Sequence, residues 1–131
     1  MKGAGVAIAM LAGAFLASSD AHAGGDALAG KKVFNKCMAC HEAATDKNKV
    51  GPSLHGVIGR AAGSLPSFVG KYSPAMTAAG AGGLVWDETN IAAYIKAPKE
   101  KVPGNRMAFP GLGDETDIAN VIAYLEEAGK Q

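Results

Sequence analysis

Two stretches near the ends of the chain carry apolar residues at helical spacing. In the first, residues 26–38, Gly30, Val33, Phe34 and Cys37 recur every three or four positions and so share one face. Asp26 can cap the start of this helix. The opposite face is polar and contains Lys31, Lys32, Asn35 and Lys36. A glycine on a buried face costs helix stability, and close approach of another helix is one reason to keep it there.

The second stretch, residues 114–128, has acidic residues at its start, where the helix dipole favours negative charge. Its apolar face is broad and consists of Ile118, Val121, Ile122, Tyr124 and Leu125. We expect the two helices to cross, with Gly30 and Phe34 of the first against Val121 and Tyr124 of the second.

Two shorter helices are predicted between the terminal ones. Ser73 at an N-cap followed by Pro74 begins a helix that ends at the glycine-rich residues 80–83. Asp87 caps the next, over residues 87–97, and Pro98 ends it. Residues 42–49, 56–72 and 99–110 lack helical periodicity and are expected to be loops. No βαβ pattern, repeat or phosphate-cradling loop is visible, so the predicted fold is all-α, with about four short helices in one domain.

The first 23 residues have the pattern of a secretory signal peptide. Lys2 supplies the positive start, residues 6–17 are apolar, and Ala21-His22-Ala23 is a small-x-small cleavage site. The apolar run is shorter than the roughly 20 residues of a membrane-spanning helix. We therefore expect cleavage after Ala23 and a soluble domain, residues 24–131, in the periplasm.

The net charge says little about partners, but the distribution of charged residues along the chain says more. The 13 basic and 12 acidic residues give a net charge of +1, which loss of Lys2 and Asp20 with the leader leaves unchanged. Lysines cluster at 31–36, 47–49 and 96–101, whereas residues 114–127 contain only acidic charges. Aromatic residues are few, and a buried prosthetic group would fill an otherwise thin core.

The stretch Cys37-x-x-Cys40-His41 is the candidate for chemistry, because it is the signature of c-type haem attachment. One helical turn puts both thiols on the same side, where they can add to the two vinyl groups of a haem, and His41 follows as the proximal iron ligand. A disulfide across so short a loop would be strained. A thioredoxin-like pair needs a strand–helix–strand surround, and a structural zinc site needs four ligands.

Several other residues have candidate roles at such a site. The Pro52 carbonyl is a candidate acceptor for the second ring N–H of a haem histidine, although Pro52 could equally only shape a turn. Arg60, Tyr72 and Trp86 could reach a propionate. His55 is more easily explained as a loop histidine bonded to backbone than as an iron ligand. Met107 lies in a proline-bounded loop and is either a soft iron ligand or a core-filling side chain.

Taken together, these residues resemble the small soluble class I cytochromes c, of the bacterial type similar to the mitochondrial protein. The resemblance covers nearly all of residues 26–128. It depends on the haem signature and on these further motifs: Gly30-x-x-x-Phe34, Gly51-Pro52-x-Leu54-His55-Gly56, Gly59-Arg60, Trp86, Tyr94, Pro103-Gly104-x-x-Met107 and Ile122-Ala123-Tyr124-Leu125.

The resemblance implies one haem c held by thioethers at Cys37 and Cys40, with iron ligated by His41 and Met107. It also implies that the Pro52 carbonyl accepts from His41, that Arg60, Tyr72 and Trp86 lie near a propionate, and that Asn105 lies in the haem pocket. A six-coordinate iron has no open position, so we expect a one-electron carrier and no enzyme.

The implied partners are membrane or periplasmic redox proteins that a monomer engages briefly, with no nucleic acid and no stable membrane insertion. Basic residues expected around the haem edge are Lys32, Lys36, Lys49, Lys99 and Arg106. The chain departs from the family's pattern at Gly113-Asp114-Glu115, where lysines are common, so electrostatic steering should be weak. Two alternatives remain: a haem protein with a labile sixth site that binds small ligands, and a dedicated subunit of one dehydrogenase or reductase.

Overall fold

The computed structural model describes residue 3 and residues 24–131, so the predicted leader lies outside the described residues except for Gly3. The described chain forms α1 (Ala27–Val33), η1 (Phe34–Lys36), η2 (Pro66–Lys71), α2 (Pro74–Ala81), α3 (Glu88–Lys96), α4 (Pro98–Lys101) and α5 (Glu115–Ala128). One isolated antiparallel bridge joins Ala61 to Val85. The predicted all-α class is confirmed, and none of the described helices has both the length and the apolar character needed to cross a bilayer.

Short polar side chains cap the starts of four helices, and three of these caps, Asp26, Ser73 and Asp87, are predicted by the sequence. The Asp26 carboxylate accepts hydrogen bonds from the backbone N–H groups of Leu28 and Ala29 at the start of α1. Ser73, Asp87 and Asp114 cap α2, α3 and α5 in the same way. These bonds satisfy N–H groups that have no partner within the helix, and so they define where each helix starts.

Two expectations about loops are wrong in part. Residues 66–71, within the predicted loop 56–72, form the 3₁₀ helix η2, and residues 98–101 form the single turn α4. Both begin with a proline, which is favoured in the first turn because it has no N–H to satisfy and its φ is already helical. Pro98 therefore ends α3 and begins a new turn at the same point.

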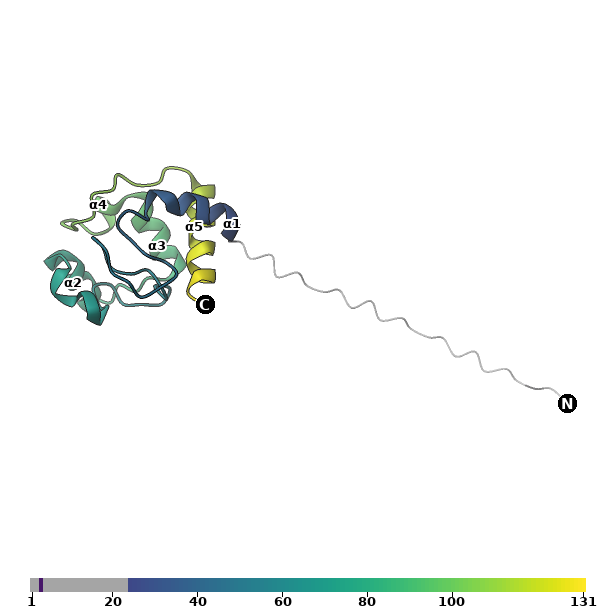
Figure 1. Cartoon of the computed structure of the whole chain (residues 1–131), viewed down its shortest axis with the longest axis horizontal. Coiled ribbons are helices and arrows are strands. Elements are labelled where there is room, and N and C mark those ends of the chain that lie inside the picture. Colours follow the sequence, from purple (N-terminus) through teal and green to yellow (C-terminus); the bar gives the residue numbers. More distant parts are fainter. Residues whose placement is uncertain (1–2, 4–23) are drawn as a thin grey trace.

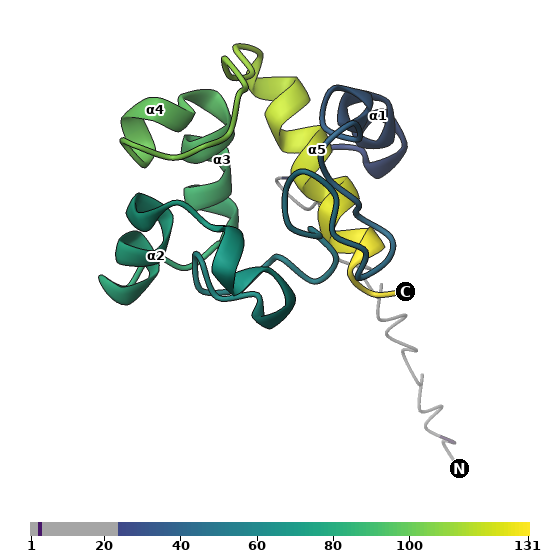
Figure 2. The ribbon, with the colours of Figure 1, turned by 60° about the vertical axis from the view of Figure 1, so that its left-hand side comes forward.

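The terminal helices α1 and α5 cross and lie side by side in both ribbon views (Figure 1, Figure 2). A Cβ built on Gly30 would overlap the backbone carbonyl of Asn120 and come within 2.9 Å of the Tyr124 Cβ. The Phe34 and Tyr124 rings pack with centroids 5.3 Å apart, and the Asp26 N–H donates to the Asn120 side chain at 2.8 Å. The predicted crossing, with a glycine at its closest point, is confirmed.

The core lies largely where α1 and α3 pack against α5, three helices that Figure 2 shows in the ribbon. Its buried members come from α1, η1, α3, α5 and several connecting loops and include Val33, Phe34, Val57, Trp86, Ile91, Val102, Leu112, Ile118, Val121 and Leu125. The second half of the predicted first helix tightens into η1 and then turns through residues 37–40. That turn brings the cysteine pair to the inner face of the domain.

The crossing predicts the effect of Gly30→Ala on stability. The new methyl group must displace the backbone of α5, and overpacking of this kind should exceed the gain of about 1 kcal/mol in helix propensity. We expect the free energy of unfolding to fall by about 1–3 kcal/mol in a denaturant titration. Gly70→Ala is the matched control, because nothing lies within 4 Å of a Cβ at that position. Equal stability of the two variants would contradict the close approach.

Candidate functional site

A cavity of about 470 Å³ opens in the middle of the described domain, a size typical of cofactor pockets. Its walls are mostly apolar and come from segments far apart in the sequence, including Phe34, Leu54, Val57, Phe68, Met76, Trp86, Ile95, Phe109, Leu112 and Val121. The chemically distinctive residues at its surface are Cys37, Cys40, His41 and Met107. The structure thus brings together the four residues that the sequence singles out.

The two cysteines reach the cavity because the chain turns tightly after η1. The backbone N–H groups of Cys40 and His41 both donate to the carbonyl of Cys37, at 3.1 and 2.9 Å. Both thiols are free, with Cys37 half-buried and Cys40 exposed. Burial raises the pKa of the Cys37 thiol, while neighbouring Lys36 acts to lower it. Within the described residues, no group of three or more His, Cys, Asp or Glu side chains is placed to hold a metal ion.

His41 is held by the loop that follows it. Its Nδ1 lies 2.7 Å from the carbonyl oxygen of Pro52. A carbonyl can only accept, so Nδ1 carries the proton and Nε2 keeps its lone pair. Burial lowers the pKa of His41, although the bond to Pro52 acts in the opposite direction, so the imidazole is neutral at neutral pH. The ring is therefore in the form that binds a metal.

Gly51 allows the loop to lie flat against this imidazole. A Cβ at Gly51 would lie 2.8 Å from Nδ1 and 2.9 Å from Nε2 of His41, too close for any side chain. The next residue then presents its carbonyl to the ring edge. The glycine and the proline of the Gly51-Pro52 motif have separate functions here: one gives space for the ring and the other gives a hydrogen-bond acceptor.

Asn105 organises the loop that carries Met107. Its amide donates to the carbonyls of Pro98 and Val102 at 3.0 and 2.9 Å, and its oxygen accepts from the Met107 N–H at 2.8 Å. Asn105 is not among the residues that line the cavity. Its side chain therefore bonds to three backbone groups, and the pocket position that the resemblance implies stays a prediction.

The adjacent Arg106 joins the Met107 loop to the end of η2. Its guanidinium donates to the carbonyls of Lys71 and Tyr72, at 3.4 and 3.2 Å. Met107 itself is half-buried and lines the cavity. The loop is thus attached at the two residues that precede the methionine, which limits the positions that its thioether can take.

Arg60, Tyr72 and Trp86 all line the cavity, but each already has protein contacts. The Arg60 guanidinium donates to the carbonyls of Ser53 and His55, both at 2.7 Å, and burial lowers its pKa. The Tyr72 hydroxyl accepts from the Leu65 N–H at 3.3 Å, and Trp86 packs on Tyr94 with ring centroids 4.9 Å apart. Their predicted contact with a propionate stays a prediction.

His55 lies outside the cavity lining and bonds to Asp46 and to the backbone of Gln131. This agrees with its interpretation as a loop histidine. Sequence reasoning missed Ser53, which is almost completely buried and joins the segments on either side of it. No signal in the sequence marks Ser53, because a serine in a polar stretch normally lies in water.

These residues fit a covalently attached haem. Two thiols, a neutral imidazole and a thioether all line the cavity. Most of its remaining walls are apolar or aromatic. The space beside His41 is kept clear by a glycine. Cys37 and Cys40 would hold the porphyrin, and His41 and Met107 have the nitrogen and sulfur donors that suit haem iron.

Comparisons with known proteins agree with this fit. A family model described as cytochrome c matches residues 27–129. Cytochrome c-554 from Methylosinus trichosporium is 47% identical over 127 residues, which cover 96% of this chain and 88% of that protein. Cytochrome c2 from Rhodoblastus acidophilus is 50% identical over 104 residues, 79% of this chain and 92% of that protein. The structure of cytochrome c2 from Rhodospirillum centenum has a TM-score of 0.72 and 42% identity, covering 79% of this chain and 98% of that one.

The family match spans all five α-helices of the described domain, and the fold, the cavity and the relatives agree. This chain belongs to the class I cytochromes c, which are electron carriers and not enzymes and which hold their iron in a covalently bound c-type haem.

Proposed function

We propose that this protein is a periplasmic shuttle that carries one electron at a time between redox proteins, through a haem attached to Cys37 and Cys40 and ligated by His41 and Met107. The observation that supports this most strongly is the convergence of these four side chains on one apolar cavity. When bound, the haem supplies the one-electron couple between Fe(II) and Fe(III).

The chain's own residues would control that couple in distinct ways. Pro52 orients His41 and makes it a better donor through the 2.7 Å hydrogen bond. The soft, neutral thioether of Met107 favours the reduced state and so raises the potential. Asn105 holds the methionine loop in place. The apolar walls exclude water, which disfavours the additional charge of the oxidised state.

Transient partners would approach the rim of the cavity. Lys36, Lys71 and Arg106 are exposed and line it, so the rim carries positive charge that can attract an acidic surface. The opposite charges Asp114 and Glu115 are also exposed, at the start of α5. We therefore propose weak steering that falls steeply with ionic strength, and brief encounters in place of a stable complex.

Export is the second part of the proposal. It is supported by the charged start, apolar run and Ala21-His22-Ala23 site of the first 23 residues. Intact-mass spectrometry of the secreted protein tests it directly. We expect a chain that begins at Gly24 and carries the added mass of one haem. A chain that retains residues 1–23 would refute cleavage, and a chain without added mass would refute covalent haem attachment.

Met107→Ala tests the sixth ligand. We expect the variant to keep its covalent haem, to lose the long-wavelength sulfur-to-iron absorption band, and to bind external small ligands. Its reduction potential should fall by on the order of 100 mV or more, because the axial ligand dominates the potential. Met76→Ala is a matched control, since Met76 also lines the cavity but lies on α2.

If Met107→Ala keeps the band and the potential, another side chain holds the sixth position. If the unmodified protein lacks the band at neutral pH, the alternative of a labile, ligand-binding site is favoured. Co-purification of the unmodified protein with one dehydrogenase or reductase would favour the alternative of a dedicated subunit.

Gly51→Ala tests how closely the loop packs on the proximal imidazole. The methyl group would force His41 or the Pro52 carbonyl to move, and so we expect less holoprotein and a free energy of unfolding lower by about 1–3 kcal/mol. Gly113→Ala serves as control, because nothing lies within 4 Å of a Cβ there. Haem content and denaturant unfolding measure the two effects. Normal haem content and stability in Gly51→Ala would show that the ring does not depend on this contact.

A further inference from the structure

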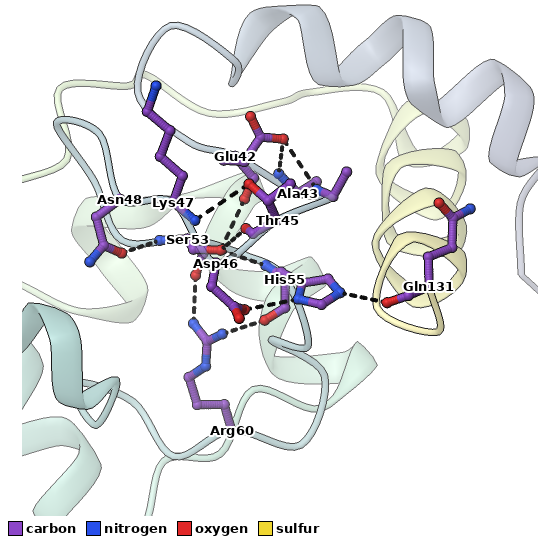
Figure 3. Close-up of polar contacts among 11 residues, drawn as sticks. Glu42, Ala43, Thr45, Asp46, Lys47, Asn48, Ser53, His55, Arg60 and Gln131 are labelled. Carbon is purple, nitrogen blue, oxygen red and sulfur yellow. Dashed lines mark hydrogen bonds and ion pairs between the residues drawn. The ribbon is translucent and has the colours of Figure 1, made fainter.

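His55 lies between two hydrogen-bond acceptors. Its Nδ1 is 2.9 Å from the Asp46 carboxylate, and its Nε2 is 3.2 Å from the backbone oxygen of Gln131 (Figure 3). A neutral imidazole has one N–H and one lone pair, so it can satisfy only one of these partners. The protonated ring donates to both. The geometry is therefore complementary to the charged form of His55.

The surroundings of His55 strengthen this preference. The hydrogen bond to Asp46 raises the pKa of His55, partial burial opposes it, and the bond to Gln131 raises it further. Asp46 and Arg60 are the charged groups that act on the ring from neighbouring loops, and Lys130 precedes Gln131 at the end of α5. The side chain is 21% exposed, so it can exchange a proton with water while water screens it less than a fully exposed group.

A buried network connects His55 to the proximal ligand. Ser53 is 1% exposed; its hydroxyl accepts from the His55 N–H at 3.1 Å and donates to the carbonyl of Thr45 at 2.6 Å (Figure 3). Arg60 spans the carbonyls of Ser53 and His55. Ser53 directly follows Pro52, whose carbonyl accepts from His41. The backbone of His55 is thus attached to the segment that holds the proximal histidine.

No other histidine competes for this role in the mature protein. The chain has three: His22 lies in the predicted leader, and the proximal His41 already donates to Pro52. Imidazole is the side chain whose ordinary titration falls between pH 5 and 8. A proton bound by histidine near neutral pH therefore belongs to His55.

We propose that His55 is a redox-linked proton-binding site, whose proton is held more tightly when the protein is reduced than when it is oxidised. The inference rests on the proposed function, because it needs a centre whose charge changes by one. In the coupled pH range, one electron arrives from a reduced partner and a fraction of a proton binds His55 from water. Oxidation returns both. The sign follows from Coulomb's law, since a positive imidazolium disfavours the additional positive charge of the oxidised state.

The linkage predicts how the reduction potential depends on pH. The potential is highest when His55 is protonated and falls as pH rises through its titration. If oxidation weakens the proton affinity about threefold, the fall is about 28 mV, because a tenfold change corresponds to 59 mV for a one-electron couple. Titration of the purified holoprotein between pH 5 and 9 resolves a step of this size.

Two variants assign the step to His55. His55→Asn keeps a side-chain N–H for Asp46 but cannot titrate, so its potential should lack the step. Asp46→Asn removes the negative partner that raises the proton affinity, so the step should remain and move to lower pH. The haem propionates are common to all three proteins, so their contribution cancels in the differences. A full step in His55→Asn would overturn the proposal.

NMR titration of the His55 ring protons in the unmodified holoprotein is the direct measurement, and it decides the matter even if a variant does not fold. We expect a pKa about half a unit higher in the reduced than in the oxidised protein, the equivalent of the threefold change. Equal values would overturn the proposal. The absorption spectrum of the same samples reports haem ligation separately, so a missing linkage with an intact sulfur-to-iron band refutes this inference and leaves the proposed function standing.

Discussion

The hydrogen bond from the His41 ring to the carbonyl of Pro52 joins the two halves of the haem site. On one side is the turn that carries Cys37 and Cys40, and on the other is the loop of residues 42–55. The bond selects the tautomer of His41 and the plane of its ring, and Gly51 gives the ring room. A ligand that is oriented before the cofactor arrives loses little conformational entropy when it binds.

The bond is effective because both of its partners are attached to rigid parts of the domain. α1 is pressed against α5 at Gly30, and this crossing sets where η1 ends and where the cysteine turn begins. The Pro52 side is held by Ser53, whose backbone N–H donates to Asn48 and whose hydroxyl donates to Thr45. The geometry at His41 is therefore a result of tertiary packing on both sides and not of the haem motif alone.

The same arrangement explains how a domain with few aromatic residues can enclose a large cofactor. The walls of the cavity come from segments spread between Phe34 and Leu125, and the short elements η2 and α2 contribute Phe68, Lys71 and Met76. Without the haem, these walls would leave apolar surface uncovered, so attachment and folding are expected to depend on each other. An electron carrier benefits from this design, because a rigid site reorganises little when the iron changes charge.

The sequence by itself determined what depends on near neighbours. The spacing of Cys37, Cys40 and His41 identifies the haem. The caps at Asp26, Ser73 and Asp87 locate three helix starts, and the acidic residues from Asp114 on mark a fourth. Periodicity on both terminal helices and the glycine at position 30 were enough to predict their crossing. These features are local or periodic, and short-range sterics and hydrogen bonding leave a readable pattern for them.

Only the tertiary structure decided which polar groups meet. The Asn105 side chain bonds to three backbone groups, from α4 to Met107. The His55 ring bonds to Asp46 and to Gln131, the latter 76 positions away in the chain. Ser53 is buried within a polar stretch, and η2 and α4 form where loops were expected. Such contacts depend on how distant segments pack, and the side chains of Asn, Ser and His can bond equally well to many partners. Their choice is therefore made by the fold and leaves no periodic signal in the sequence.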